Sequence, residues 1–226
     1  MGKALFITGT GTDIGKTYVT GLIVKKLVDA GLRAGYYKAA LSGAETLADG
    51  TLLPGDALHV AQIAGLAAED ASVSYIYRDA VSPHLAAQIE NRPIDFDKVE
   101  QDFKQAQERM DYLTVEGSGG IICPLRWDDV EHVVLDDLVL RLGLSALVVA
   151  DAGLGTINAA VLTAEHLRMR GISLKGFIFN NWQGGTMQED NVRMVEALTG
   201  APVLACVEHG AVELPMAADA LAALYD

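Results

Sequence analysis

A glycine-rich loop near the N-terminus holds the residue types with the most specific chemistry in this chain. Residues 9–17 read Gly-Thr-Gly-Thr-Asp-Ile-Gly-Lys-Thr and follow the short apolar run of residues 4–7 directly. A loop that joins a strand to a helix in this way points backbone N–H groups at one place and collects phosphate. Lys16 adds a mobile positive charge for the outer phosphates, and the Thr17 hydroxyl can hold Mg²⁺. The segment therefore predicts a nucleoside triphosphate site.

The loop departs at one position from the strict phosphate-binding pattern Gly-x₄-Gly-Lys-Ser/Thr. Thr10 stands where that pattern has glycine, and the glycines lie at Gly9, Gly11 and Gly15 instead. The alternative interpretation is a chance Gly-Lys-Thr in a surface turn. The apolar run before the loop and the helical pattern after it favour the phosphate site, because that setting makes the amides converge.

Three carboxylates stand where strands are expected to end or helices to begin. Glu116 closes an apolar run before Gly-Ser-Gly-Gly, where it can reach a metal ion on bound phosphates; a solvated or helix-capping glutamate is the alternative. Asp56 follows Pro-Gly at the start of a helix, so an N-cap role would account for it without a metal. Asp151 precedes Gly153 and Gly155, and we expect it to be a turn residue rather than a second metal ligand.

Two further polar side chains are expected at the same rim of a sheet. Lys38 ends the strand-like run Gly-Tyr-Tyr-Lys, and Ser42 and Gly43 follow it within a short loop. Lys38 would face the phosphate loop, although a solvated lysine at a strand end is the alternative. Asn180 ends another apolar run, where its amide could read the edge of a base or simply form a turn.

Apolar runs alternate with amphipathic stretches along the chain, and this alternation sets the expected fold. We expect strands at residues 4–8, 34–38, 112–116, 146–151, 176–180 and 203–207. We expect helices at residues 16–30, 56–64, 96–109, 158–170, 189–198 and 215–224, and irregular regions at 41–55 and 70–95. Near-continuous Val/Ile/Leu runs are typical of parallel strands covered on both faces. The pattern predicts an α/β fold with a three-layer, doubly wound, mostly parallel sheet. Together with the phosphate loop at residues 9–17, which departs from the strict pattern, this fold is expected to be of the deviant P-loop NTPase class.

Composition limits the class of protein. The 226 residues suit a single domain, 1–226, and half of them are hydrophobic. A net charge of −13 argues against a nucleic-acid partner, and the absence of a long apolar stretch argues against a membrane span. No secretion signal is visible, so we expect a cytoplasmic protein. The widely separated Cys123 and Cys206 are expected to be buried free thiols, and the five scattered histidines suggest no zinc site.

Taken together, these segments resemble the dethiobiotin synthetase family, the ATP-dependent carboxylases that close the ureido ring in biotin synthesis. The resemblance covers nearly the whole chain. It rests on the loop at 9–17, Gly-Tyr-Tyr-Lys with Ser-Gly in 35–43, Asp-Ala-Leu at 56–58, Ser-Pro-His at 82–84 with Asn-Arg-Pro-Ile at 91–94, Glu-Gly-Ser-Gly-Gly at 116–120 with Pro-Leu at 124–125, and Gly-Leu-Gly-Thr-Ile-Asn at 153–158. Each piece alone is weak, but their order along the chain is specific.

The resemblance implies a reaction and a set of partners. The substrates would be 7,8-diaminopelargonic acid, CO₂ or bicarbonate, and ATP with Mg²⁺. One substrate amine would become a carbamate, whose oxygen attacks the γ-phosphate to give a carbamic–phosphoric anhydride. The second amine would then close the ring and expel phosphate. The family also implies a homodimer.

The resemblance also implies a role for each matching residue. Catalysis would fall to Lys38, Lys16 and Thr12. Nucleotide binding would fall to Thr12, Asp13, Gly15, Lys16, Thr17, Tyr18 and Asn180. The metal would be held by Thr17, Asp56 and Glu116. Substrate binding would fall to Ser42, Lys38, Gly117, Ser118 and Asn158, with Asn158 reaching across a dimer interface into the site of the partner.

The chain departs from the family pattern at several positions. Ala39 replaces the usual proline after the lysine of the second strand, and Ser118 replaces an alanine. Residues 204–210 read Leu-Ala-Cys-Val-Glu-His-Gly and lack the proline of the segment that cradles adenine in the family. We therefore expect that the preference for the nucleotide base could be relaxed or altered.

Other functions of the same fold remain as alternatives. A switch-type ATPase of the partitioning class would carry an extra lysine at the position of Gly11. An amidating ligase of cobalamin synthesis would need a glutaminase domain that this length does not hold. A small-molecule kinase would need an arginine-rich lid, whereas residues 120–145 offer only Arg126 and Arg141. A binding protein without activity would have no need of the lysines and carboxylates of the site.

Overall fold

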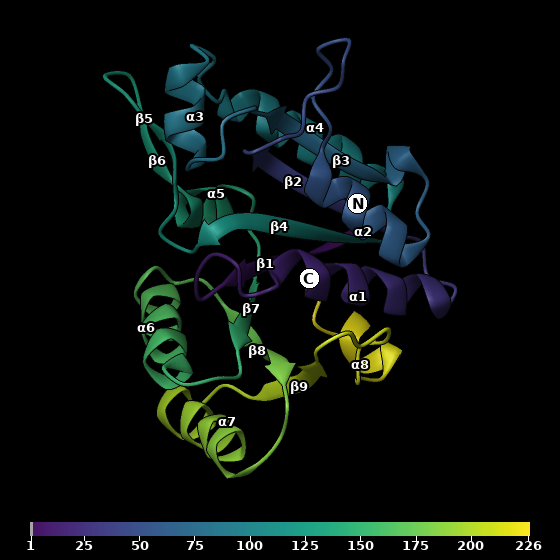
Figure 1. The fold of residues 1–226 in the computed structure, drawn as a ribbon, viewed down its shortest axis with the longest axis vertical. Coiled ribbons are helices and arrows are strands. Elements are labelled where there is room, and N and C mark those ends of the chain that lie inside the picture. The colour runs from purple at the N-terminus through teal and green to yellow at the C-terminus, as the bar shows by residue number, and fades with distance from the viewer. Residues whose placement is uncertain (1) are drawn as a thin grey trace.

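A sheet of seven parallel strands runs through the middle of residues 2–226, the part of the chain that this computed structural model describes (Figure 1). The strands lie in the order β3 (Ala71–Ile76), β2 (Ala34–Leu41), β4 (Tyr112–Gly120), β1 (Lys3–Gly9), β7 (Ala146–Asp151), β8 (Leu174–Trp182) and β9 (Val203–Glu208). The central strands are buried on both faces, and all eight residues of β2 are buried. This burial explains the near-continuous apolar runs in the sequence.

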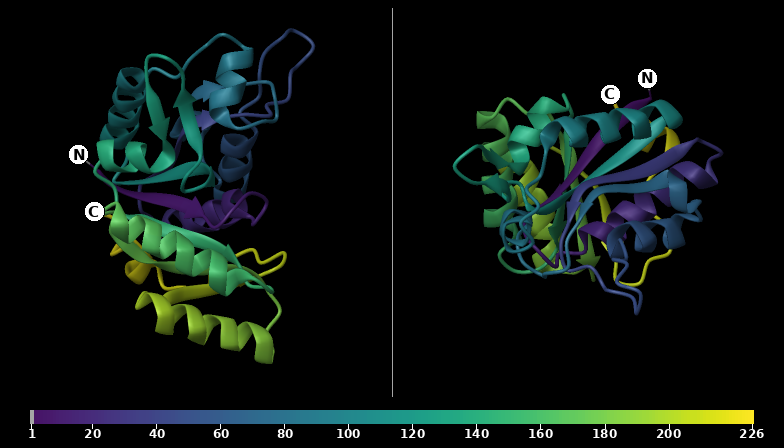
Figure 2. Two further views of the ribbon diagram at one scale, coloured as in Figure 1. Left: turned by 90° about the vertical axis from the view of Figure 1, so that its left-hand side faces the viewer. Right: turned by 90° about the horizontal axis from the view of Figure 1, so that it is seen from above.

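Helices cover both faces of the sheet and complete three layers, which are seen edge-on in Figure 2. One face packs against α1 (Lys16–Asp29), α2 (Gly55–Ala64) and the short α8 (Ala218–Ala222). The other face packs against α3 (Pro83–Ile89), α4 (Phe96–Arg109), α5 (Leu135–Arg141), α6 (Thr156–Met169) and α7 (Thr186–Thr199). The predicted doubly wound α/β fold is therefore confirmed.

The order of the strands determines where a ligand can bind. The chain leaves β1 toward β2 and later returns on the opposite side of β1 with β7, so β1 lies where the direction of winding changes. In open parallel sheets, ligands bind beyond the carboxyl ends of the strands at such a point. The loop of residues 9–17 follows β1 and so lies at this rim, next to the ends of β2 and β4.

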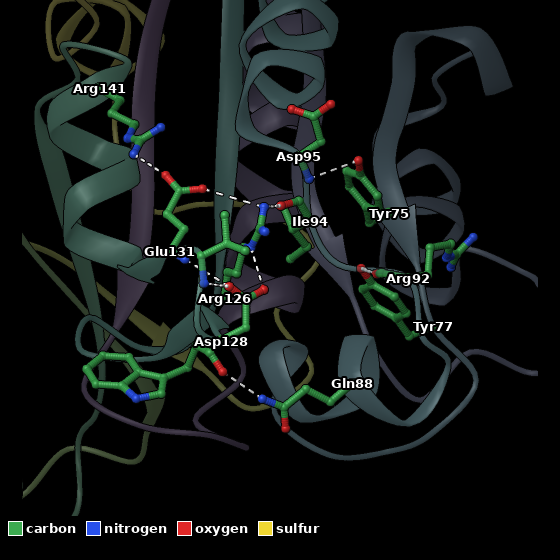
Figure 3. A network of polar contacts seen from close by, with 12 residues as sticks. Tyr75, Tyr77, Gln88, Arg92, Ile94, Asp95, Arg126, Asp128, Glu131 and Arg141 are labelled. Atoms are coloured by element: carbon green, nitrogen blue, oxygen red, sulfur yellow. Dashed lines mark hydrogen bonds and ion pairs between the residues drawn. The ribbon is translucent and has the colours of Figure 1, made fainter.

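A two-stranded hairpin, β5 (Pro124–Trp127) and β6 (His132–Val134), is separate from the main sheet (Figure 1), and its polar contacts are drawn in Figure 3. The Arg126 guanidinium donates to an Asp128 carboxylate oxygen at 2.7 Å and to the Ile94 carbonyl at 3.0 Å. Gln88 of α3 donates to the Trp127 carbonyl at 2.7 Å. These contacts fix the hairpin against α3 and the segment before α4, away from the phosphate loop.

Three segments differ from the expectations drawn from the sequence. Residues 124–141 contain β5, β6 and α5, none of which was expected. Residues 70–95 contain β3 and α3 instead of an irregular region, because β3 is a half-buried edge strand whose serines dilute the apolar signal. The helix expected at 215–224 is shortened to α8. Its first residues form a turn instead, in which the Met216 N–H donates to the Leu214 carbonyl, and Pro215 lies within that turn.

Candidate nucleotide and metal site

The phosphate loop opens α1 with unpaired amides, as the sequence predicts. Gly15 has φ +82°, a left-handed conformation that turns the chain into the helix. The first hydrogen bond within this helix runs from the Val19 N–H to the Gly15 carbonyl at 3.0 Å. The amides of residues 16–18 precede it and are the donors that a helix N-terminus offers to an anion.

A cavity of about 410 Å³ lies against this loop. Its lining comes from the loop, α1, the carboxyl-terminal halves of β2 and β4, the residue after β2, and α2. The residues are Thr12, Asp13, Gly15, Lys16, Thr17, Tyr18, Lys38, Ser42, Asp56, His59, Glu116, Ser118 and Gly119. Segments far apart in the sequence therefore meet at one rim of the sheet, as predicted. Lys38 and Glu116 do not end their strands, however, because β2 continues to Leu41 and β4 to Gly120.

The ammonium group of Lys38 lies between two carboxylates at the floor of this cavity. Its Nζ is 2.8 Å from Glu116 Oε1 and 2.6 Å from Asp56 Oδ2. The Lys38 and Glu116 residues are register partners on β2 and β4, and both are buried. Thr17 donates its hydroxyl to the same Glu116 Oε1 at 2.8 Å. The four side chains form one hydrogen-bonded cluster.

Burial and charge act in opposite directions on the two lysines of the site. Burial alone would lower the pKa of Lys38, but the carboxylates of Glu116 and Asp56 outweigh it and raise that pKa. Burial lowers the pKa of Lys16, and Glu116 only partly opposes the shift. The Lys38 ammonium is thus held in its charged form by the two carboxylates of the site.

The oxygen ligands of the cluster suit Mg²⁺ bound together with phosphates. Mg²⁺ usually keeps several waters and takes one or two carboxylates plus phosphate oxygens. Thr17, Asp56 and Glu116 supply a hydroxyl and two carboxylates, and Glu116 Oε2 is buried with no partner in the described chain. No group of three His, Cys, Asp or Glu residues within 2–226 could hold a metal ion by itself. The residues therefore fit a metal that arrives with a nucleotide.

Eleven of the predicted site residues line the cavity, and three do not. Gly117 lies inside the sheet, where a side chain would meet Leu135 and Phe6 at 2.8 Å. Asn158 is exposed on α6, outside the cavity. Asn180 is buried below the phosphate loop, and its side-chain amide donates to the Ile14 carbonyl at 2.9 Å.

Two of the lining residues, His59 and Gly119, were not predicted from the sequence. His59 lies on α2 three residues after Asp56, so the helical i, i+3 spacing could have placed it on the same face. Gly119 has φ +62° and lies near the side chains of Thr12 and Cys123. No feature of the local sequence distinguishes it from the glycines beside it.

Asp151 and the two cysteines are not among the residues that line the cavity. Asp151 is a turn residue, as expected: its Oδ1 accepts from the Gly153 N–H at 2.7 Å. Its other oxygen accepts from the Asn181 amide at 2.6 Å. Cys123 and Cys206 are free thiols, but they are half-buried rather than buried, because each lies at the margin of the core.

Comparison with known proteins gives consistent results for the whole chain. A family model described as an AAA domain matches residues 3–212. An ATP-dependent dethiobiotin synthetase BioD of Brachyspira hyodysenteriae is 47% identical over 216 residues, which cover 95% of this chain and 96% of that protein. A protein of the same name from Clostridium botulinum is 45% identical over 219 residues, with 96% of both chains covered.

Solved structures with little sequence similarity share the fold alone. A ParA family ATPase from Chlorobium tepidum superposes with a TM-score of 0.54 at 15% identity, covering 91% of this chain and 83% of that chain. The MinD cell division protein of Aquifex aeolicus gives a TM-score of 0.54 at 14% identity, with 91% of this chain and 81% of that chain covered.

Among residues 2–226, none of the helices has the length and apolar character needed to cross a membrane. Given relatives of one name that match it almost end to end, the chain belongs to the family of ATP-dependent dethiobiotin synthetases.

Proposed function

We propose that this enzyme carboxylates 7,8-diaminopelargonic acid and closes the product to dethiobiotin, with conversion of ATP to ADP and phosphate. The observation that carries the proposal is the position of the Lys38 ammonium. It lies beside the phosphate loop, in a cavity that Ser42 and Ser118 also line. An ATPase that transfers phosphate only to water would not need a second buried lysine with serines nearby. An anionic phosphoryl acceptor would need such groups, because they hold its negative charge near the γ-phosphate.

The chemistry requires three changes in bonding. A substrate amine adds to CO₂ and loses a proton, which leaves a carbamate. A carbamate oxygen attacks the γ-phosphorus and breaks its bond to ADP, which gives a carbamic–phosphoric anhydride. The second amine attacks the carbonyl carbon, the carbon–oxygen bond to phosphate breaks, and the amine loses a proton as the ring closes.

The phosphate loop has the task of holding and aligning the triphosphate. The amides at the start of α1 and the Lys16 ammonium would bind the phosphate oxygens, and Thr12, Asp13 and Tyr18 would line the path of the nucleotide. Phosphoryl transfer passes through a transition state with charge spread over the oxygens, so alignment and positive charge supply most of the catalysis.

Lys38 would stabilise the acceptor side of the same step. In the structure it pairs with Glu116 and Asp56. A bound carbamate and γ-phosphate would offer it two further anionic partners. Lys38 would then neutralise charge on the oxygen that passes from the carbamate to phosphorus. Thr12 and Ser42 would orient the carbamate and the neighbouring amine.

We propose that the reaction also requires Mg²⁺, which when bound would neutralise charge on the triphosphate. Thr17, Asp56 and Glu116 would hold it through one hydroxyl and two carboxylates. Glu116 would have to exchange its contact with Lys38 for the metal, which would release the lysine toward the substrate. The same exchange would couple metal binding to the availability of the catalytic ammonium.

We propose a homodimer in which Asn158 acts in the site of the partner. Large apolar side chains are exposed around this region: Leu154 is 93% exposed, Leu162 62% and Ile122 59%. Leu162 and Ile122 line one shallow cavity of about 340 Å³ between α6 and the end of β4. An apolar surface of this kind supports burial against a second copy of the chain. Placement in the cytoplasm would agree with the two free thiols.

A product assay tests the proposal directly. Purified protein is incubated with 7,8-diaminopelargonate, bicarbonate and each of the four magnesium nucleoside triphosphates, and the cyclic urea is measured by mass spectrometry. We expect dethiobiotin and stoichiometric phosphate with ATP, and activity with a second nucleotide if residues 204–210 relax base selection. Phosphate release at the same rate with and without the diamine would contradict the proposal and favour a simple ATPase.

A further inference from the structure

Among the buried oxygen atoms that have no hydrogen-bond partner within residues 2–226, two lie on the neighbouring strands β2 and β4. One is Glu116 Oε2, the oxygen that neither Lys38 nor Thr17 contacts. The other is the Tyr36 hydroxyl, on a side chain with 0% exposure. The carboxylate oxygen of Glu116 is a hydrogen-bond acceptor, and the Tyr36 hydroxyl can donate. Buried polar atoms are rarely left unpaired, so such a complementary pair requires an explanation.

The register of the sheet places these two side chains in the same layer. The strands β2 and β4 lie side by side (Figure 1). In their register, Tyr36 pairs with Thr114 and Lys38 pairs with Glu116. Side chains two residues apart on a strand point to the same face, so Tyr36 and Glu116 both lie on the face covered by α1 and α2. Two residues advance a parallel strand by about 6.6 Å, a distance that a tyrosine ring with its hydroxyl can span.

The electrostatics of Tyr36 agree with this placement. Burial raises the pKa of its hydroxyl well above the usual value, and the negative charges of Glu116 and Asp56 raise it further. The phenol therefore remains protonated and can act only as a neutral donor toward a carboxylate. Tyr37, on the opposite face of β2, is different, because its hydroxyl contacts Ser74 at 2.8 Å and the Val99 carbonyl at 2.9 Å.

We propose that Tyr36 is a positioning residue for Glu116, its hydroxyl donating to Oε2 so that Oε1 stays directed at the Thr17 hydroxyl and the metal position. The inference rests on the proposed use of Mg²⁺ but not on the identity of the organic substrate. Glu116 must keep its orientation when Lys38 leaves Oε1, and a second hydrogen bond on Oε2 supplies that restraint. Groups that orient metal ligands in this way strongly influence metal affinity.

The test compares Tyr36→Phe with Tyr37→Phe, which removes a hydroxyl from the other face of the same strand. Mn²⁺ replaces Mg²⁺ as a paramagnetic probe, and its affinity is measured by electron paramagnetic resonance with a non-hydrolysable ATP analogue present. We expect Mn²⁺ affinity to fall about 10-fold to 100-fold in Tyr36→Phe and to change less than about twofold in Tyr37→Phe. Affinity for the metal-free analogue should be equal in both variants, because the phosphate loop is untouched.

We expect Tyr37→Phe to lower thermal stability, because the Tyr37 hydroxyl has two hydrogen-bond partners. A destabilised Tyr37→Phe variant with normal Mn²⁺ affinity would show that a loss of stability does not by itself weaken metal binding. Unchanged Mn²⁺ affinity in Tyr36→Phe would overturn the proposal. If that variant fails to fold, a crystal structure of the unaltered protein with Mn²⁺ and the analogue decides the question. An Oη–Oε2 separation of about 2.5–3.0 Å supports it, and a hydroxyl bonded elsewhere overturns it. Neither measurement depends on dethiobiotin formation. A failure of the Tyr36 proposal can therefore be distinguished from a failure of the proposed reaction.

Discussion

Lys38 and Glu116 face each other on adjacent parallel strands, with the ammonium 2.8 Å from the carboxylate, and both side chains are almost fully buried. Removing one member of a buried pair leaves the other charge without compensation, which is costly. A pair of this kind is more than a stabilising contact when it borders a phosphate-binding cavity. In the proposed reaction, the pair would hold the catalytic ammonium of Lys38 and the metal-binding carboxylate of Glu116 together until the substrates separate them.

Replacing Lys38 should impair turnover far more than nucleotide binding. We expect Lys38→Ala to lower kcat by about 10²-fold or more, because one cation aimed at a transition state in a dry site supplies that much. The affinity for ATP should remain, since the loop amides and Lys16 are intact. Steady-state kinetics and calorimetry make the comparison, with the surface variant Lys25→Ala as the control on α1. An unchanged kcat would remove Lys38 from the mechanism.

Lys16→Ala should have a different profile, because this lysine lies in the phosphate loop itself. We expect loss of MgATP turnover together with weaker binding of the triphosphate, while the thermal unfolding midpoint stays close to that of the unaltered chain. Burial already lowers the pKa of Lys16, so its removal also removes a desolvated charge. Substantial residual turnover would discredit the assignment of residues 9–17.

Asn180 offers a test between base recognition and support of the loop. Its amide donates to the Ile14 carbonyl, and a side chain on Gly15 would lie 2.1 Å from its amide nitrogen. If support dominates, Asn180→Ala weakens the binding of ATP and of inorganic tripolyphosphate by a similar factor. A loss confined to ATP would show that Asn180 reads the base, as the family resemblance implies. Calorimetry with both ligands separates the two results.

The role of Asn158 across a dimer can be tested by mixing inactive subunits. In a heterodimer of Lys16→Ala and Asn158→Ala chains, one site combines an intact Lys16 with an Asn158 supplied by the partner. We expect each variant alone to be impaired and the purified heterodimer to recover about half of the normal activity. If Asn158 serves its own subunit, both sites in the heterodimer remain defective and no activity returns.

The two thiols should be slow to react at neutral pH. Burial raises the pKa of both Cys123 and Cys206, and the nearby lysines only partly offset this at Cys123. The reactive thiolate is therefore scarce at pH 7 and becomes common only above the usual thiol range. Mass spectrometry after iodoacetamide treatment should show little modification of the folded protein, with a rate that rises with pH. Rapid alkylation of Cys123 at pH 7 would contradict the burial seen here.

Much of this arrangement could be predicted from the sequence, and the exceptions have physical causes. Lys38 and Glu116 were predictable as site residues because parallel strands bring their carboxyl-terminal parts to one edge. They were wrongly expected to end their strands, since β2 continues to Leu41 and β4 to Gly120. The contact between them was not predictable, since it depends on the register of β2 against β4. The edge strand β3 was missed because its residues are half-buried and alternate with serine. The role of Asn180 under the loop depends on an approach of segments far apart in the sequence, which no local pattern encodes.

The most direct test of the central claim follows an oxygen atom. The enzyme is given 7,8-diaminopelargonate, MgATP and freshly dissolved C¹⁸O₂, and the released phosphate is analysed by mass spectrometry during the first turnovers. If a carbamate oxygen attacks the γ-phosphorus in this cavity, each phosphate formed carries one heavy oxygen from CO₂. Phosphate with no label above that of the surrounding water would mean that water is the acceptor, and would contradict the account.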